Sequence, residues 1–343
     1  MRPDRAGGLT GAALLSACAT LSGAPAHAQS APFELCTIEE SGLSELSGMA
    51  SDGDNWYAIN DSGSRARAFV LDPRTCEVRS QRTGDSDPYD VEDLALAPDG
   101  ALWLADTGDN GHKRKDVALH VLDRNGGSAL YRMSYPDSPH DAEALLLDRA
   151  GVPHIVTKEP LGWAGVYRPA EPLDPARTVP MARVGSVSLR ATKTPGGPLD
   201  GSMGSVLVTG GSVSADGTLV ALRTYTEAYV YRSPNGDVLE ALKSEPVRIP
   251  LPDEEQGEAI AWEPGGSLLS GSEGGEAVRR IAGANGDPSA ETATDQPAPP
   301  GGDGDQAQPA TEEGGMSTGR ALLFAGVIAA LLVYLIGWRR KRF

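Results

Sequence analysis

The sequence predicts an all-β fold, and within that class a β-propeller, from three observations. Short runs of alternating apolar and polar residues are separated by Gly, Asp and Pro turns, which is the pattern of strands. No stretch before residue 318 keeps a helical period. One pattern occurs five times at intervals of about 45–70 residues, a spacing typical of propeller blades.

Each repeat begins with Ser or Glu, continues with small or apolar residues, and leads through a turn into a second strand-like run. The opening residues are Ser47, Glu92, Glu143, Ser212 and Glu258.

The last repeat lacks a fourth strand, and residues 33–38 form a spare strand before the first repeat. If that N-terminal strand completes the last blade, the ring has no open edge. We favour five blades and keep six open, because the long gap after Glu143 leaves room for a degenerate blade.

The two ends of the chain are predicted to lie outside the propeller, which we assign to residues 32–281. Residues 1–28 have a basic start, an apolar stretch and Ala26-His27-Ala28, as in a secretory signal peptide. In a second interpretation Leu15-Ser16-Ala17-Cys18 is a lipobox and Cys18 is lipidated. We favour cleavage after Ala28, because the far end of the chain supplies another anchor.

That anchor is a transmembrane helix predicted at residues 318–338. Its last 18 residues carry no charge and would span roughly 27 Å as a helix, and a basic tail follows at residues 339–343. The basic tail belongs on the cytoplasmic side, so we expect a single-pass protein of the cell membrane with its N-terminus and propeller outside. Residues 282–317 are rich in Gly, Pro and acidic residues and are predicted to be a disordered tether.

Charge and cysteines restrict the function further. The net charge of −17, with no basic stripe outside the tail, argues against nucleic acid as a partner. Two cysteines, Cys36 and Cys76, remain once the signal peptide is removed. In an oxidising compartment an even pair predicts one disulfide, with two free buried thiols as the alternative.

The repeat openings also predict a site. The first strand of each blade lines the central channel of a propeller, so the five opening residues are expected to meet around one axis. Three of the five are carboxylates, which repel at close range unless protons or a cation lie among them. Hydroxyl and carboxylate oxygens without His or thiolate suit a hard cation, and we expect Ca²⁺.

The order Ser, Glu, Glu, Ser, Glu resembles the channel residues of the calcium-activated nucleotidase (apyrase) family, and Glu45-Leu46-Ser47 is similar to the first motif of that family. The resemblance implies a five-bladed propeller with a central calcium ion. It does not extend to the nucleotide-binding loops of the family. From Ser44 to Glu273 the chain also resembles secreted bacterial propellers described as WD40-like, NHL-like or phytase-esterase-like, which implies fold and location.

A second set of candidate residues, three acidic and two basic, stands at or just past the ends of the second strands. The acidic side chains would bind a metal or activate water, and the basic side chains would hold a phosphate or carboxylate. Alternatively, the cations only neutralise the channel carboxylates and the aspartates form Asx turns. These candidate catalytic residues are Asp61, Asp106, Lys158, Arg223 and Glu273.

Two function classes remain. The first is a membrane-anchored module that binds an extracellular ligand or protein, with a structural Ca²⁺ in its channel. The second is a Ca²⁺-dependent extracellular hydrolase of phosphate or ester substrates, with its site at the channel mouth. The sequence favours the first, because it offers no G-x-S-x-G elbow, Walker loop or dinucleotide fingerprint, and no nucleophile–base pair can be named.

Overall fold

Twenty strands make up most of the regular structure in the computed structural model, which describes residues 31–199 and 202–286. The described residues also contain one short α-helix, α1 (Val238–Leu242), and one 3₁₀ turn, Ser41–Leu43. The strands are β1 (Phe33–Thr37), β2 (Leu46–Ser51), β3 (Trp56–Asn60), β4 (Arg67–Leu71), β5 (Val78–Thr83), β6 (Val91–Leu96), β7 (Leu102–Asp106), β8 (Val117–Leu122), β9 (Ser128–Ser134), β10 (Ala142–Leu147), β11 (Pro153–Thr157), β12 (Trp163–Pro169), β13 (Val179–Ser188), β14 (Val208–Val213), β15 (Leu219–Thr224), β16 (Glu227–Arg232), β17 (Val247–Pro250), β18 (Gly257–Trp262), β19 (Leu268–Ser272) and β20 (Ala277–Ile281).

The strands pair in consecutive antiparallel runs of four, which we number as units. Unit 1 is β2–β5, unit 2 is β6–β9, unit 3 is β10–β13 and unit 4 is β14–β17, while unit 5 combines β18–β20 with β1. Units 2 and 3 are joined into one eight-stranded sheet, because β9 and β13 pair in parallel at Met133–Val179 and Ser134–Pro180.

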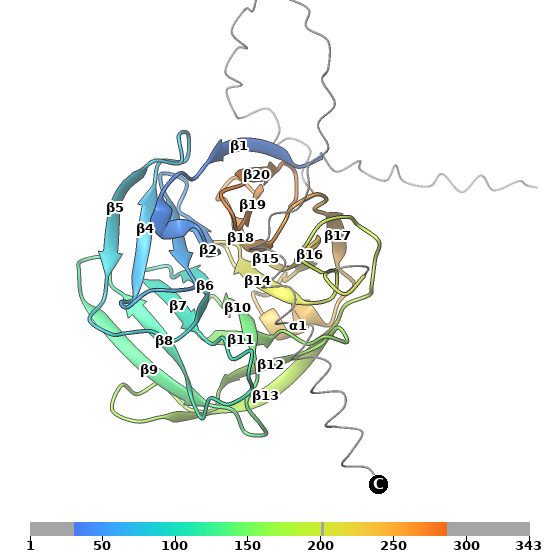
Figure 1. The fold of residues 1–343 in the computed structure, drawn as a ribbon. Helices are drawn as coiled ribbons and strands as arrows, with labels where there is room; N and C mark the ends of the chain where they lie inside the picture. Colours follow the sequence, from blue (N-terminus) through green and yellow to red (C-terminus); the bar gives the residue numbers. More distant parts are fainter. Residues whose placement is uncertain (1–30, 200–201, 287–343) are drawn as a thin grey trace, which may run out of the picture. The chain divides into compact units, whose positions relative to one another are not determined.

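The units are arranged around a common centre. The first strand of each unit contacts the first strand of the next, in the order β2, β6, β10, β14 and β18, and β18 contacts β2 again. Figure 1 shows these five inner strands near the middle and β5, β9 and β13 at the periphery. This closed ring of radial sheets is a β-propeller, as the sequence predicted.

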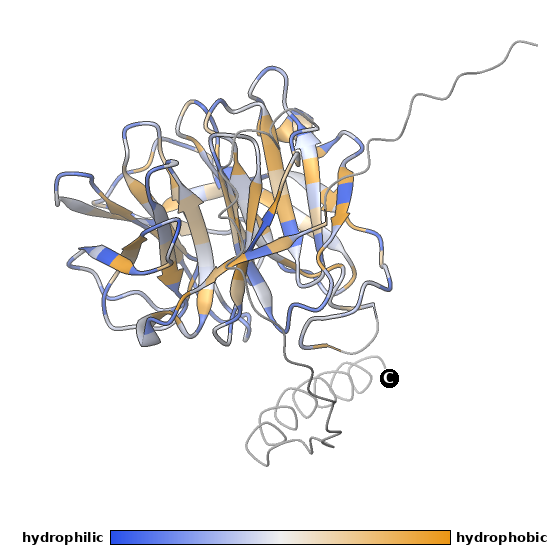
Figure 2. Ribbon diagram, turned by 90° about the horizontal axis from the view of Figure 1, so that it is seen from above, coloured by the Kyte–Doolittle hydropathy of each residue, from blue (hydrophilic) through white to orange (hydrophobic). Residues whose placement is uncertain are grey.

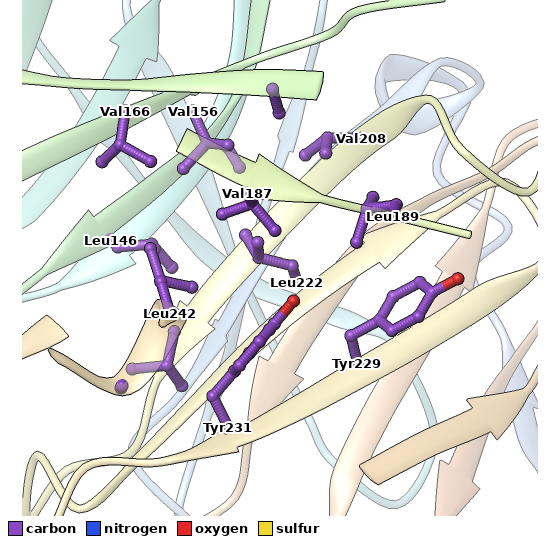
Figure 3. Close-up of a cluster of buried hydrophobic side chains, with 14 of the residues drawn as sticks. Leu146, Val156, Val166, Val187, Leu189, Val208, Leu222, Tyr229, Tyr231 and Leu242 are labelled. Carbon is purple, nitrogen blue, oxygen red and sulfur yellow. The ribbon is translucent and has the colours of Figure 1, made fainter. Parts of the chain in front are cut away.

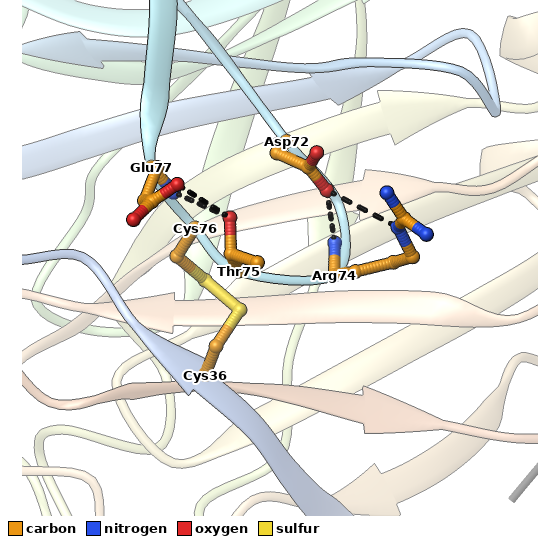
Figure 4. Close-up of a disulfide and its surroundings, with 6 residues drawn as sticks. All are labelled: Cys36, Asp72, Arg74, Thr75, Cys76 and Glu77. Atoms are coloured by element: carbon orange, nitrogen blue, oxygen red, sulfur yellow. Dashed lines mark hydrogen bonds and ion pairs between the residues drawn. A yellow bond between two sulfur atoms is a disulfide. The ribbon is translucent and has the colours of Figure 1, made fainter. Parts of the chain in front are cut away.

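The N-terminal strand completes the last unit. β1 pairs antiparallel with β20, so the sheet order is β1-β20-β19-β18. A disulfide joins Cys36 on β1 to Cys76 in the turn between β4 and β5, with Cα atoms 5.8 Å apart (Figure 4). Both features confirm the prediction, and the disulfide ties unit 5 to unit 1 where the ring closes.

Replacing both Cys36 and Cys76 with serine is expected to lower the free energy of unfolding by about 2–4 kcal/mol, because the bond closes a long loop and restricts the unfolded chain. Denaturant unfolding of the oxidised protein and of the double variant measures this difference. Equal midpoints would show that the bond contributes nothing to closure of the ring.

Apolar side chains fill the spaces between neighbouring units. Between units 3 and 4, side chains of β10, β11 and β13 pack against those of β15, β16 and α1, and Leu146, Val187, Leu222 and Tyr231 lie at the centre of this cluster (Figure 3). Apolar residues line the strands and polar residues gather in the loops (Figure 2). Residues 189–199 and 202–207, where a degenerate sixth blade was considered, form no strand.

The signal peptide with Cys18, nearly all of the tether, the helix at 318–338 and the basic tail lie outside the described residues. Within the described part of the chain, no helix is long and apolar enough to cross a membrane.

Candidate functional site

Each inner strand begins with a bulge, and the bulged residue carries the chemistry of the site. The register between the first and second strands shifts by one residue near the start of every unit. A bulge leaves one residue outside the ladder and turns its side chain in a new direction. The bulged residues are Ser47, Glu92, Glu143, Thr209 and Glu258.

The prediction of Ser212 at this position was wrong by three residues. Ser212 follows the bulge of β14, and its hydroxyl accepts a hydrogen bond from Trp262 N at 3.1 Å. Thr209 occupies the bulge instead. The prediction had matched the repeats by residue type alone and had therefore selected the hydroxyl of Ser212. Thr209 donates to Gly257 O at 3.0 Å, and Ser47 donates to Glu92 O at 2.6 Å. The two hydroxyls of the ring therefore link neighbouring inner strands.

Three carboxylates converge beside the bulges of units 2 and 3. One oxygen each from Glu92, Asp141 and Glu143 lies within 4.8 Å of the others, and the residues are 6%, 5% and 3% exposed. Asp141, which immediately precedes β10, was not among the predicted ligands. Its position two residues before a repeat opening was the only signal in the sequence. We call these three residues the carboxylate cluster.

Part of this cluster has no hydrogen-bond partner. Lys158 Nζ lies 2.5 Å from Glu143 Oε1, whereas Glu143 Oε2 is buried and has no partner among the described residues. The Glu92 carboxylate lies directly against Gly108, since a Cβ there would overlap Glu92 Oε1 and lie 2.5 Å from Asp90 Oδ2. The cluster thus presents one buried carboxyl oxygen that has no partner among the described residues.

Burial and mutual repulsion favour protons on these carboxyl groups. Burial, together with the neighbouring carboxylates, raises the pKa of Glu92 well above its ordinary value. Burial raises the pKa of Glu143 to about 8, even though Lys158 opposes the rise. Burial and the adjacent Glu273 raise the pKa of Glu258 to about 8. Near neutral pH these groups hold protons unless a cation replaces them.

Lys158 is the ammonium group inside this ring. Burial opposes its charge, but Glu143, Tyr225 and Glu258 hold the pKa of Lys158 well above its ordinary value. Its Nζ also donates to Tyr225 Oη at 2.8 Å. Lys158 therefore stays charged and neutralises part of the ring.

The register places the second set of residues differently from the prediction. The first residue of each inner strand pairs with a residue at or near the end of the second strand of the same unit. The residues that come immediately after these partners are Asp61, Thr107, Lys158, Tyr225 and Glu273. Asp61, Lys158 and Glu273 thus take equivalent positions just past the ends of the second strands. Asp106 and Arg223 lie one and two residues earlier, and the structure gives them other surroundings.

Arg223 is fully buried between units 4 and 5. Its guanidinium lies 2.6 Å from Glu254 Oε2 and donates to Ser270 Oγ at 2.9 Å and to the backbone oxygen of Ala259 at 3.0 Å. With its donors engaged inside the protein, Arg223 holds two units together and does not face a ligand at the mouth.

Asp106 has a similar structural role inside unit 2. Its carboxylate accepts hydrogen bonds from the backbone N–H groups of Tyr89 and Asp90 at 3.1 and 3.0 Å. It also contacts Arg114 at 2.8 Å and His120 at 3.1 Å. Burial opposes the ionised form, but His120 and Arg114 keep the pKa of Asp106 below its ordinary value.

Asp61 and Glu273 complete an acidic mouth. Burial raises the pKa of Asp61 to about 6, with the charges of Glu45 and Asp90 adding to the effect. Burial likewise raises the pKa of Glu273, whose carboxyl group interacts with that of Glu258. The mouth therefore carries many more acidic groups than its one lysine neutralises.

A further carboxylate, Asp93, directly follows the bulged Glu92 on β6. Asp93 is fully buried on β6 and accepts hydrogen bonds from its neighbour Leu94 N at 2.8 Å, from Leu145 N on β10 at 2.7 Å and from Gly211 N on β14 at 3.0 Å. One side chain thus connects three inner strands. The sequence showed it only as an acidic residue in an otherwise small and apolar run.

Comparisons with known proteins do not assign a family. No family model and no curated protein matches the chain. Among solved structures, a protein assigned to the gluconolactonases matches at 14% identity over 71% of this chain and 76% of its own, with a TM-score of 0.41. A virginiamycin B lyase of Staphylococcus aureus matches at 10% identity over 69% and 66% (TM-score 0.35), and a PQQ-bound aldose sugar dehydrogenase of Streptomyces coelicolor at 11% over 75% and 99% (TM-score 0.39). Likenesses this weak carry no argument, so the propeller assignment rests on the sheets themselves.

Proposed function

We propose that this protein is an extracytoplasmic, membrane-anchored, five-bladed propeller that binds a ligand or protein outside the cell and holds one Ca²⁺ ion in its channel. Each four-stranded unit is one blade, and residues 318–338 anchor the chain. The observation that carries the cation proposal is the unpartnered, buried Oε2 of Glu143, because a buried polar atom without a partner is costly.

The residues present fit a calcium ion. Glu92, Asp141 and Glu143 offer only carboxylate oxygens, with neither His nor Cys in the cluster. Calcium accepts six to eight oxygens in irregular arrangements, whereas Mg²⁺ demands near-octahedral geometry. The ion would replace the protons that the buried carboxyl groups otherwise hold, and it would connect the inner strands of units 2 and 3.

Titration calorimetry of the purified full-length protein with Ca²⁺ and Mg²⁺ tests this proposal. We expect one Ca²⁺ ion per chain and weaker binding of Mg²⁺. Glu143→Gln removes the unpartnered carboxylate oxygen but keeps the size of the side chain, so it should weaken Ca²⁺ binding at least about tenfold, or about 1.4 kcal/mol.

Glu171→Gln is the matched control, because Glu171 is a half-exposed carboxylate paired with Arg177 on the surface. It should bind Ca²⁺ like the unmodified protein. Absence of Ca²⁺ binding, or equal binding by Glu143→Gln, would disprove the assignment of the site.

A second candidate function is hydrolysis of phosphate or ester substrates at the same mouth. It is favoured by Asp61, which is half-buried and whose pKa of about 6 allows it to exchange protons near neutral pH. In this proposal Asp61 would accept a proton from water as the water oxygen bonds to the phosphorus or carbonyl carbon, and it would return the proton to the alcohol oxygen whose bond to that atom breaks. Lys158 and a bound cation would hold the substrate oxygens. A panel of phosphatase, nucleotidase and esterase substrates with added Ca²⁺ tests it. Turnover that is lost in Asp61→Asn would support hydrolysis, and absence of turnover would leave binding as the function.

A further inference from the structure

A cavity of about 310 Å³ lies at the other end of the inner strands from the carboxylates. Every unit contributes to its wall, through Ser51, Leu96, Leu147, Val213 and Pro264. These residues lie at or just past the ends of the inner strands, about four residues beyond the bulges, which is roughly 13 Å along an extended chain. Asp93, bonded to three inner strands, lies between the two ends. The cavity is therefore separate from the candidate cation site.

Three arginines line this cavity, and two of them have no partner. Arg124 and Arg149 make no hydrogen bond or ion pair with any described residue. Arg82 is engaged, since it donates to Gly100 O at 2.6 Å and to Tyr57 Oη at 3.3 Å. The cavity thus offers two guanidinium groups whose donors are unused.

Both arginines are exposed to solvent, and their stems run past glycines. Gly217, whose φ is +72°, leaves room for Arg149, because a Cβ there would overlap Arg149 Cγ. Gly236 gives the same stem space, with a hypothetical Cβ only 2.7 Å from Arg149 Cδ. A Cβ at Gly100 would lie 3.2 Å from Arg124 Cδ. Arg149 therefore crosses from unit 3 onto unit 4 along a path that only glycine leaves open.

The acidic residues of the cavity, Asp52 and Asp148, form no ion pair with these arginines. Asp52 accepts hydrogen bonds from Asn55 N and from Tyr57 Oη at 2.7 and 2.6 Å. Asp148 Oδ1 accepts from the backbone N–H groups of Ala150 and Val152, both at 2.8 Å. The two carboxylates offset part of the positive charge, but three arginines line the cavity, and the guanidinium donors of Arg124 and Arg149 remain available to a ligand.

We infer that this cavity binds a small organic anion through a carboxylate or phosphate group. Guanidinium pairs bind such groups by two parallel hydrogen bonds, which gives both affinity and orientation. The volume admits a molecule of several carbon atoms, larger than a single inorganic ion. The two ends of the channel would then differ in charge preference, with a cation at the carboxylates and an anion at the arginines. This site goes beyond the proposed cation binding and does not depend on it.

Titration calorimetry of the full-length protein with citrate and with inorganic phosphate, at low ionic strength and after divalent cations have been removed on a chelating resin, tests the inference. No soluble chelator, itself a polycarboxylate, then competes for the cavity, and a failure of the cation proposal does not affect this result. We expect saturable binding of one citrate per chain, and weaker binding of phosphate, which is smaller than the cavity. The double variant Arg124→Gln/Arg149→Gln should bind citrate at least tenfold more weakly.

Arg74→Gln is the control, because Arg74 is largely exposed on unit 1 and lies outside the cavity. It should bind citrate as the unmodified protein does, and thermal melting should show that all variants are folded. Absence of citrate binding, or equal binding by the folded double variant, would overturn the inference.

Discussion

Replacing Asp93 with alanine is expected to lower the free energy of unfolding by about 4–5 kcal/mol, which is a large effect for a single side chain. The substitution leaves the N–H groups of Leu94, Leu145 and Gly211 without their acceptor in a fully buried place. Each buried donor left unsatisfied costs about 1–3 kcal/mol. Because these donors belong to three units, the loss weakens the centre of the ring. Equilibrium unfolding in urea, monitored by circular dichroism, measures the effect.

Asp99→Ala is the matched control for this prediction. Asp99 is an exposed aspartate in a turn, and its carboxylate accepts one hydrogen bond, from Ala101 N at 3.0 Å. It should lose only about 0.5–1.5 kcal/mol. If both variants lose the same amount, Asp93 is not the central link between the inner strands.

The protein without bound cations should lose stability as the pH rises, by on the order of 4 kcal/mol between pH 5 and 8.5. The pKa values of Glu143 and Glu258 are raised to about 8 in the folded protein, so folding favours their protonated forms. This stabilisation is fully present below about pH 4.5, where the unfolded chain also holds these protons, and it disappears as the pH rises through about 8.

Calcium should reverse this trend. As the carboxyl groups lose their protons, the ion competes with fewer protons and stabilises the folded state more strongly. Melting temperatures in EDTA and in Ca²⁺ should therefore diverge as the pH rises from 5.5 to 8.5. Glu143→Gln, whose amide resembles a protonated carboxyl group, should show a smaller slope in EDTA and a smaller gain from Ca²⁺. Parallel curves for the unmodified protein would contradict this explanation.

The fold was largely predictable because the repeat has a physical cause. Every unit needs a first strand that packs in the centre, a turn and further strands that bury one another, so the same pattern returns along the chain. The spare strand at residues 33–38 pointed to closure for the same reason, and the pairing of β1 with β20 confirms it. The predicted pair Cys36–Cys76 is also confirmed.

The site was less predictable because it depends on register. The sequence does not show where a bulge falls, so a match by residue type selected Ser212, three residues after the bulged Thr209. Differences of one or two residues likewise place Asp106 and Arg223 inside the protein and Tyr225 at the mouth. Asp93 was missed, and Asp141 was left out of the predicted ligands, because both have partners in other units and a contact between units leaves no spacing in the sequence.

The most direct test of the account is the position of the cation itself. A crystal of the protein soaked in Tb³⁺, which replaces Ca²⁺ at oxygen sites, gives an anomalous difference map that locates the ion without reference to its ligands. The account predicts one dominant peak within coordination distance of Glu92, Asp141 and Glu143, which is absent in Glu143→Gln. A channel without a peak, or a dominant peak elsewhere on the protein, would contradict it.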